Sequence, residues 1–424
     1  MRKLIASIRQ FLSELRRRNA VILSAVAGLA APGMAADADG FIHGTVTTRS
    51  ESSYTGIMRW GGEEAFWDDL FHSSKVERPY VRERDPRADD ESSSWWEVFG
   101  RKMKISFGEE GSRVLAARFG DIRSIEVTGD KAARLEMRGG STIAVEGYAN
   151  DVGATILVHD AVLGRIEIPW KQIRGVEFSA VPAGTEPPAF RLHGRVTTDS
   201  GDLEGFVQWD SEECLSTDRL DGDTQDGRVS LEMGRVRSIE RRGSSSSLVV
   251  LDDGRELVLD GTNDVNSSIR GILVADPRYG RVEVPWQAFR RIELDTASGS
   301  GRGYAEFTAP RPLTGTVTTR DGARHVGRLV YDLDEAQTWE MLDGTAFELE
   351  YSIPFELVAS VEPSGRSASI VTLVSGEELR LEDSQDVARR NDGVMVLGDG
   401  GAETYVPWEE IRRIELSGSL AANR

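Results

Sequence analysis

VEVPWQAFRRIE, at residues 282–293, occurs three times along this chain in nearly the same form. The other two copies are IEIPWKQIRGVE at residues 166–177 and TYVPWEEIRRIE at residues 404–415. Proline removes a donor from a strand ladder, so the Pro-Trp pair in the middle of each copy marks the end of a strand. The residues after it predict one short helical turn, and the last five positions of each copy predict a closing strand.

Each copy closes a longer repeat that opens on a second signature. The openings are HGTVTT at residues 43–48, HGRVTT at 193–198 and TGTVTT at 314–319. Self-similarity of this kind is the sequence signature of a repeat architecture. The predicted organisation is repeat 1 (41–178), a linker (179–190), repeat 2 (191–294), a linker (295–313), repeat 3 (314–416) and a frayed tail (417–424). The Pro, Gly and Ser content of both linkers predicts extended or flexible connections.

Each repeat is also duplicated within itself. The first half of repeat 2 ends VSLEMGRVRSIE (229–240), in the same frame as the stretch at 282–293 that ends its second half. Runs such as GRVTTDSGDLEGFVQW (194–209) alternate apolar and polar residues around a Gly-containing turn, which is typical of a half-buried hairpin. We therefore predict an all-β chain of three tandem repeats of about 100 residues, each a pair of small barrels of about 50 residues.

The succession G-x-V-x-T, Gly-containing turn, G-x-V-x-W and closing I-x-x-I-E strand resembles SH3-like and Sm-like small β-barrels. In tandem, the units are similar to those of exported bacterial repeat proteins. Such barrels host many functions, so the resemblance implies a fold and no particular activity. An alternative architecture keeps each repeat as a single β-sandwich, which would give three sandwich domains.

The N-terminal residues predict export. Six basic side chains precede or flank an apolar run, AVILSAVAGLAA (20–31), and small residues follow it. That order is typical of a secretory signal peptide over residues 1–35, which would place the mature chain in the bacterial periplasm or outside the cell. No later stretch is apolar enough to predict a membrane helix. The formal charge of −19 would repel phosphate backbones, so no nucleic-acid partner is expected.

Repeat 1 is longer than the others and is predicted to carry an aromatic-rich insertion at about residues 61–111. A long loop on a repeat scaffold is a common place for function. Loop aromatics can bind an apolar partner surface or a sugar ring, and they can also merely anchor the loop to the barrel beside it. The predicted partner-binding residues are Phe66, Trp67, Phe71, Trp95, Trp96 and Phe99.

Two further residue types recur once in each repeat. The tryptophans Trp170, Trp286 and Trp408 are interpreted as structural positions that pack where the short turn meets the barrel, with surface sugar binding as the alternative. The aspartates Asp151, Asp264 and Asp386 are interpreted as Asx-type turn residues, with calcium binding as the alternative.

The sequence contains no pattern that identifies catalysis. The single cysteine, Cys214, has no histidine near it in sequence and is read as a quiet, partly buried thiol, and the five histidines lack metal-ligand spacing. No catalytic residue, metal or cofactor is predicted. The expected function is a non-catalytic exported scaffold or binding protein whose partner, a protein or an envelope polysaccharide, contacts the insertion. The alternative is a carbohydrate-binding protein or glycoside hydrolase of the cell envelope.

Overall fold

The computed structural model describes residues 37–76, 113–147, 151–296, 299–307 and 311–417, and the backbone of 96–98 and 101–103. Over these residues the chain is all-β, as predicted, and its helices are single 3₁₀ turns. They are η1 (Phe119–Asp121), η2 (Trp170–Gln172), η3 (Met233–Arg235), η4 (Asn263–Val265), η5 (Tyr304–Glu306), η6 (Phe355–Leu357), η7 (Asp399–Gly401) and η8 (Trp408–Glu410). None of the described helices is long and apolar enough to cross a membrane.

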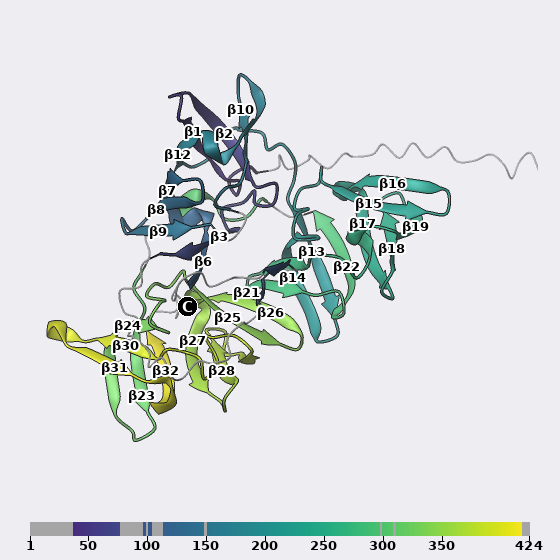
Figure 1. Ribbon diagram of the computed structural model, residues 1–424. Helices are drawn as coiled ribbons and strands as arrows, with labels where there is room; N and C mark the ends of the chain where they lie inside the picture. The colour runs from purple at the N-terminus through teal and green to yellow at the C-terminus, as the bar shows by residue number, and fades with distance from the viewer. Residues whose placement is uncertain are drawn as a thin grey trace, which may run out of the picture. The chain divides into compact units, whose positions relative to one another are not determined.

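Each repeat supplies ten strands in the same order along the chain (Figure 1). Those of repeat 1 are β1 (His43–Thr48), β2 (Ser53–Trp60), β3 (Leu70–Lys75), β6 (Arg113–Arg118), β7 (Ile122–Gly129), β8 (Ala132–Met137), β9 (Thr142–Glu146), β10 (Ile156–Asp160), β11 (Gly164–Ile168) and β12 (Ile173–Phe178). A separate hairpin, β4 (Trp96–Val98) with β5 (Arg101–Met103), lies between β3 and β6 in sequence.

The strands of repeats 2 and 3 follow the same plan. Those of repeat 2 are β13 (Leu192–Thr198), β14 (Gly201–Gln208), β15 (Arg219–Thr224), β16 (Gly227–Glu232), β17 (Val236–Arg242), β18 (Ser246–Leu251), β19 (Glu256–Asp260), β20 (Ile272–Asp276), β21 (Gly280–Val284) and β22 (Phe289–Thr296). Those of repeat 3 are β23 (Thr314–Thr319), β24 (Arg324–Tyr331), β25 (Met341–Ala346), β26 (Leu349–Pro354), β27 (Val358–Pro363), β28 (Ala368–Leu373), β29 (Glu378–Glu382), β30 (Val394–Leu397), β31 (Glu403–Val406) and β32 (Ile411–Ser417).

All three repeats share one antiparallel topology. The sheet of repeat 1 has the order β11-β10-β2-β1-β12-β7-β8-β9-β3-β6. Pairings in repeat 2 give the equivalent order β21-β20-β14-β13-β22-β17-β18-β19-β15-β16. Repeat 3 gives β31-β30-β24-β23-β32-β27-β28-β29-β25-β26. Since β21 also pairs with β26, repeats 2 and 3 belong to one continuous sheet.

The two halves of each repeat exchange strands. In repeat 2, β13 and β14 pair with β20 and β22 from the end of the repeat, not with the strands that follow them. The strands between, β15 to β19, pair among themselves as a second group of five. The internal duplication predicted from the sequence therefore does not correspond to two groups of consecutive strands. One group combines β13 and β14 of the first half with β20, β21 and β22 of the second. The other combines β15, β16 and β17 of the first half with β18 and β19 of the second.

The repeated glycines permit neighbouring, paired strands of the sheet to approach each other closely. A Cβ atom on Gly194 would lie 2.3 Å from the carbonyl oxygen of Glu293, and one on Gly205 would lie 2.0 Å from that of Ala275. Real Cβ atoms do not approach oxygen so closely, so only glycine fits without moving a strand. The same contact occurs at the equivalent positions, which are Gly44, Gly56, Gly315 and Gly327.

Residues 299–307 of the second linker pack against the core of repeat 1. The Phe307 side chain is 1% exposed and belongs to the apolar cluster of repeat 1. Tyr304 donates a hydrogen bond from its hydroxyl to the carbonyl oxygen of Ile122 at 3.0 Å and lies under the guanidinium of Arg138. The prediction of flexibility from Gly and Ser content was wrong for residues 299–307, because two aromatic side chains bind this segment to repeat 1.

Candidate functional site

Three of the predicted partner-binding aromatics are fully buried. Phe66, Trp67 and Phe71 are each 0% exposed, so none of them presents a surface to a partner. Trp67 lies against the ring of Tyr304 with centroids 4.4 Å apart, and Phe71 packs on Trp60 inside the core of repeat 1. Trp96 begins β4, while Trp95 and Phe99 lie outside the described residues. For the first three, the anchoring alternative is the one that matches the structure.

The boundary of the insertion explains this result. Strand β3 pairs with β6 in the way that β15 pairs with β16, so residues 63–75 belong to the repeat itself. In repeat 2 only Gln225 and Asp226 connect the equivalent strands, whereas repeat 1 places residues 76–112 there. The insertion therefore begins at residue 76, and the predicted start near residue 61 was wrong by the length of one turn and one strand.

One acidic residue in each repeat organises the turn that precedes the third strand. A single carboxylate oxygen of Asp69 accepts hydrogen bonds from the backbone N–H groups of Ala65 and Phe66, both at 2.8 Å. The equivalent acids in repeats 2 and 3, each accepting two backbone N–H groups in the same way, are Asp218 and Glu340. These bonds occupy one side of each carboxylate and leave the other oxygen for a different partner.

The second oxygen of each of these acids meets a cation from another repeat. Asp69 lies 3.5 Å from Arg191, Asp218 lies 2.5 Å from Arg59, and Glu340 lies 2.8 Å from Lys75. The three cationic side chains are at most 17% exposed. Burial opposes the charge of Lys75, but the carboxylates of Glu340 and Asp334 outweigh it and raise its pKa. The equivalent acidic residue of each repeat thus forms an ion pair with a cation of another repeat.

Arg191 shows how completely such a cation is enclosed. Its guanidinium carbon lies 4.0 Å from the ring centroids of both Phe66 and Phe206, so the cation is held between one ring from repeat 1 and one from repeat 2. It also donates to a carboxylate oxygen of Asp68 at 2.7 Å. A cation held over aromatic faces away from water is stabilised by the negative faces of the rings.

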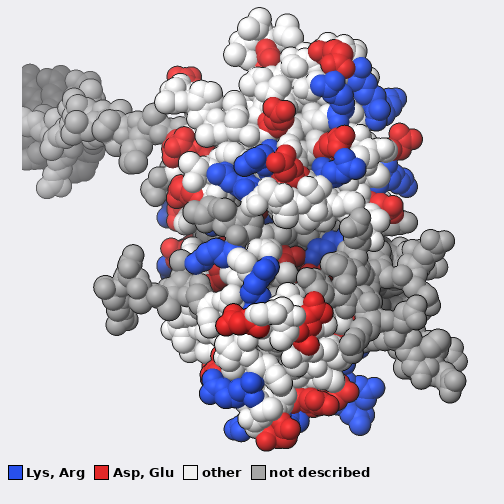
Figure 2. Space-filling view, turned by 90° about the vertical axis from the view of Figure 1, so that its left-hand side faces the viewer, with Lys and Arg blue, Asp and Glu red and all other residues white. Residues whose placement is uncertain are grey.

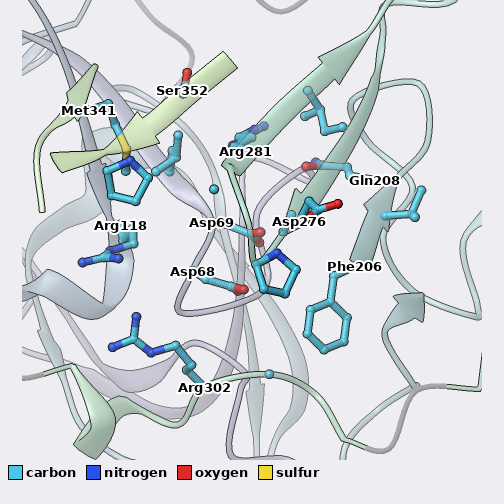
Figure 3. Close-up of a pocket in the computed structure, with 18 of the residues that line it drawn as sticks. Asp68, Asp69, Arg118, Phe206, Gln208, Asp276, Arg281, Arg302, Met341 and Ser352 are labelled. Carbon is cyan, nitrogen blue, oxygen red and sulfur yellow. The ribbon is translucent and has the colours of Figure 1, made fainter. Parts of the chain in front are cut away.

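A pocket of about 570 Å³ opens where residues of all three repeats and the second linker meet (Figure 3). In Figure 3 the carboxylates of Asp68, Asp69 and Asp276 lie near its centre. The apolar part of its lining comes from Leu70, Phe206, Val207, Leu273, Met341 and Leu357. A volume of this size is typical of small-ligand sites, which combine an apolar lining with a few polar groups.

Most charged groups of this pocket already form ion pairs. Arg118 contacts Asp121 and Glu356, both at 2.7 Å, and Asp276 holds Arg278 at 2.6 Å. Arg302 is different, because its nearest carboxylate oxygen, on Glu356, lies 4.0 Å away and its side chain is 43% exposed. Its guanidinium lies over the Phe307 ring and donates a hydrogen bond to the carbonyl oxygen of Glu306 at 3.1 Å, and a partly exposed guanidinium of this kind can meet an acidic group of a ligand.

A second, more polar pocket of about 830 Å³ lies between repeats 1 and 2. Its lining includes Glu213 and Asp264. Burial raises the pKa of Glu213 to about 9, and the neighbouring carboxylates of Asp264 and Asp210 add to the effect. Burial also raises the pKa of Asp264 to about 6, although a hydrogen bond from the Asp221 N–H opposes it. Two carboxyl groups with separated pKa values are the arrangement used in general acid–base chemistry.

The same carboxyl pair occurs in the other two repeats. Glu64 with Asp151, and Glu335 with Asp386, occupy the equivalent positions, and burial followed by nearby acids raises the pKa of both glutamates. In every repeat one carboxylate oxygen of the aspartate accepts the N–H of a residue in the third strand, such as Asp221 at 2.7 Å. This contact joins distant strands, so the predicted local Asx turn was wrong. Threefold repetition indicates that the pair belongs to the scaffold.

Replacing Glu213 with glutamine is expected to flatten the pH dependence of folding stability. The native state keeps the Glu213 proton up to about pH 9, whereas an unfolded chain releases it near pH 4.5. Between these values the unfolded state binds fewer protons, so this carboxyl lowers the free energy of unfolding by up to about 1.4 kcal/mol for each pH unit of increase. Guanidinium unfolding of both proteins from acidic to alkaline pH measures the slope. Parallel curves for the variant and the original chain would contradict the assignment.

The recurring tryptophans and the single cysteine are buried. Trp170, Trp286 and Trp408 are 4–5% exposed, as the structural interpretation requires, and the indole N–H of Trp286 donates to the carbonyl oxygen of Gly243 at 3.0 Å. Cys214 is a buried free thiol whose pKa is raised by burial, which leaves it protonated and unreactive at neutral pH. Within the described ranges no group of three or more His, Cys, Asp or Glu residues is arranged to hold a metal ion.

The residues that join the repeats carried a signal in the sequence that was not used. Asp69, Asp218 and Glu340 each lie nine positions after the recurring aromatic residue, at 60, 209 and 331 respectively. On the face shown in Figure 2, acidic and basic side chains alternate and no large patch of one sign forms. This face offers no continuous basic surface for a nucleic acid.

Comparison with known proteins identifies no family for this chain. No family description matches the sequence, and no curated protein matches it. Among solved structures, a streptogramin B lyase is 11% identical, with 70% of this chain and 94% of that chain covered and a TM-score of 0.11. A TM-score this low carries no argument about fold or function.

Proposed function

We propose that this chain is a non-catalytic, exported binding protein of the bacterial periplasm, and that a segment of a partner protein enters the pocket between its three repeats. The observation that carries the proposal is the lining of that pocket by residues from all three repeats. Phe206, Leu70 and Met341 would contact an apolar side chain of the partner, and Arg302 would contact an acidic one. Both are ordinary features of ligand and peptide recognition.

The ionised groups around this pocket favour binding over catalysis. Asp69 is bonded to backbone N–H groups and to Arg191, and Asp276 is bonded to Arg278 and to the N–H of Glu204. A general base must be able to take a proton from a substrate, and a carboxylate held by a guanidinium is poorly suited to that task.

We further propose that each five-stranded group is an SH3-like small barrel. Its support is the strand order of the group β22-β13-β14-β20-β21, in which the Pro-Trp turn separates β21 from the closing strand β22. The insertion at 76–112 is proposed as a second contact region for the partner, because long loops on rigid scaffolds commonly carry recognition.

Affinity capture from a bacterial envelope extract tests the proposal. Tagged residues 36–424 are compared with Arg302→Glu and with a chain in which residues 76–112 are replaced by Gln-Asp, copying the turn between β15 and β16. Capture of a partner protein is expected to fall at least about tenfold for Arg302→Glu, since a charge reversal opposes the same contact. Arg134→Glu, at an exposed site of repeat 1, is the control.

The outcomes separate the two contact regions. Loss with Arg302→Glu alone supports the pocket, and loss with the insertion replacement alone assigns recognition to residues 76–112. A partner captured equally by all four proteins would contradict both proposals.

The alternative, a cell-envelope glycan-binding protein or glycoside hydrolase, is favoured by one observation, the separated pKa values of Glu213 and Asp264 in the polar pocket. A protonated Glu213 would donate a proton to a leaving oxygen, and Asp264 would act as the ionised partner. Incubation with isolated envelope polysaccharide, with Glu213→Gln as the comparison, tests this candidate. Release of new reducing ends by the original chain and not by the variant would establish it over the binding function.

A further inference from the structure

Repeat 2 is joined to repeat 3 by a pairing between two outer strands. Strand β21 pairs antiparallel with β26, placing Arg281 opposite Ser352, Val282 opposite Tyr351 and Glu283 opposite Glu350. The turn before β21 contributes Tyr279, whose ring meets that of Tyr351 with centroids 5.6 Å apart. The Tyr279 hydroxyl donates to a carboxylate oxygen of Glu377 at 2.7 Å. This interface therefore has a strand pairing with an aromatic contact at its end.

Two of the strands equivalent to β21 and β26 have an outer edge that pairs with no other strand of the described residues. Strand β11 of repeat 1 is equivalent to β21, and among the described residues it pairs with β10 alone. Strand β16 of repeat 2 is equivalent to β26 and is an outer strand that pairs with β15. Unpaired N–H and C=O groups along an outer strand are a template for another strand, so these two edges are potential interfaces.

The exposed apolar side chains lie at the β11 edge, and the β16 edge contributes the half-buried Val229. In the turn before β11, Val162 is 89% exposed and Leu163 is 65% exposed, whereas Tyr279, at the position of Leu163, is 7% exposed. Ile166 and Val229 are half-buried, while their counterparts in the covered interface, Val282 and Tyr351, are 0% and 6% exposed. Exposed apolar residues that line an unpaired strand indicate a site of association.

The glycine at the start of each strand gives an independent comparison. A Cβ on Gly280 of β21 would lie 2.6 Å from the side chain of Pro354, so β26 approaches this position closely. Gly164 of β11 has the same left-handed backbone, with φ of +75°, but no atom within 4 Å of its Cβ position. No described residue fills beside repeat 1 the space that β26 fills beside repeat 2.

We propose that β11 of one copy of this chain pairs with β16 of a second copy, in the register that β21 and β26 use within the chain. This register places Ile166 opposite Val229 and Glu167 opposite Arg228, so an apolar pair and an ion pair face each other. Oppositely charged residues directly across an antiparallel pair stabilise it, and like charges destabilise it. The covered interface has Glu283 opposite Glu350 at that position, so the charges at β11 and β16 are the more complementary set.

This pairing is heterologous, because the two copies contribute different strands. After the first contact forms, one copy keeps a free β16 and the other keeps a free β11. Heterologous contacts extend into rings or open filaments instead of stopping at a dimer. The inference does not depend on the proposed pocket, since neither β11 nor β16 contributes to its lining.

Sedimentation velocity of residues 36–424 over a range of concentrations tests the inference, with Glu167→Arg and Arg228→Glu as variants. Both side chains are more than 60% exposed and form only surface ion pairs, so both variants are expected to fold normally. The original chain is expected to gain mass as concentration rises. Each variant alone is expected to associate at least about tenfold more weakly, because it places two like charges opposite each other.

The most informative measurement is the association of an equimolar mixture of the two variants. In the mixture, β11 of the Glu167→Arg variant can pair with β16 of the Arg228→Glu variant, which restores opposite charges across the contact. Association is therefore expected to return toward the level of the original chain. Glu403→Arg on β31, the remaining strand equivalent to β21, is the matched control and is expected to change nothing. A monomeric original chain at every concentration, or variants that associate as strongly as it does, would overturn the proposal, and so would loss of association with Glu403→Arg.

Discussion

Gly205→Ala is expected to destabilise repeat 2 strongly, with a loss of about 3 kcal/mol in the free energy of unfolding. The added Cβ would lie 2.0 Å from the carbonyl oxygen of Ala275 and 2.8 Å from its carbon. These are backbone atoms of β20, so the methyl group can be accommodated only if β14 and β20 separate and lose hydrogen bonds. Equilibrium unfolding in guanidinium, followed by Trp fluorescence, measures the loss.

Gly129→Ala is the matched control for this experiment. Its added Cβ would lie 3.4 Å from the Cβ of Ala132 and 3.9 Å from the backbone nitrogen of the same residue, which are ordinary contacts. A change of less than about 1 kcal/mol is expected there, in either direction. If both alanine variants lost the same free energy of unfolding, the close approach of β14 and β20 would not be the reason for glycine at position 205.

Lys75→Met is expected to cost about 3–5 kcal/mol in the free energy of unfolding. The Lys75 ammonium lies 2.8 Å from a carboxylate oxygen of Glu340 and 3.0 Å from one of Asp334, and all three side chains are at most 10% exposed. Removing the cation leaves two buried carboxylates without compensation, which is more costly than losing the pair itself. Urea unfolding at neutral pH measures the effect.

A second substitution separates charge from packing in this experiment. Adding Glu340→Gln to Lys75→Met removes one of the stranded charges, so the double variant is expected to recover part of the lost stability. Arg134→Met removes an exposed ion pair with Glu126 and is expected to change stability by no more than about 1 kcal/mol. A Lys75→Met variant no less stable than Arg134→Met would show that the buried contact between repeats 1 and 3 contributes little.

Much of the architecture could be predicted from the sequence because the repeat landmarks have direct physical causes. The Pro-Trp stretches predicted a short turn and a closing strand, and η2 with β12 and η8 with β32 confirm this. Gly194 and Gly205 recur because paired strands approach them too closely for a Cβ atom. Their spacing in the sequence therefore marks where strands of the sheet come closest. Alternating apolar and polar residues predicted the hairpins for the same reason.

The exchange of strands could not be predicted in this way. Strand β20 reads ILVAD and β15 reads RLDGDT, and both contain buried positions, so the alternation of apolar and polar residues does not state which of them pairs with β14. Burial alone does not distinguish these partners, because pairing specificity between similar strands depends on connections and long-range packing. The sequence therefore predicts that there are two similar halves without indicating which strands each group contains.

The candidate site was less predictable, because two predictions made from residue composition were wrong. The aromatics Phe66, Trp67 and Phe71 were assigned to a loop by counting excess residues, but the excess begins only after Lys75. The Gly- and Ser-rich segment around residue 300 was expected to be flexible, although Tyr304 and Phe307 bind it to repeat 1. In both cases the decisive information was the packing of a few aromatic side chains.

The exchanged strands also determine when a repeat can acquire its structure during synthesis. Leu192 at the start of β13 pairs with Thr296 at the end of β22, so the hairpin of β13 and β14 lacks its other native partners, β22 and β20, until the last three strands have been made. Contacts between such distant residues slow folding, because the chain must close a long loop before the contact stabilises it. A chain that leaves the ribosome in this order can pair the strands β15 to β19 first, and it completes the group of β13 and β14 only when β22 has been made. A chain cut between β17 and β18 would separate β13 and β14 from β22 and β20, and β17 from β18, so the midpoint of a repeat is a poor place to divide it for expression.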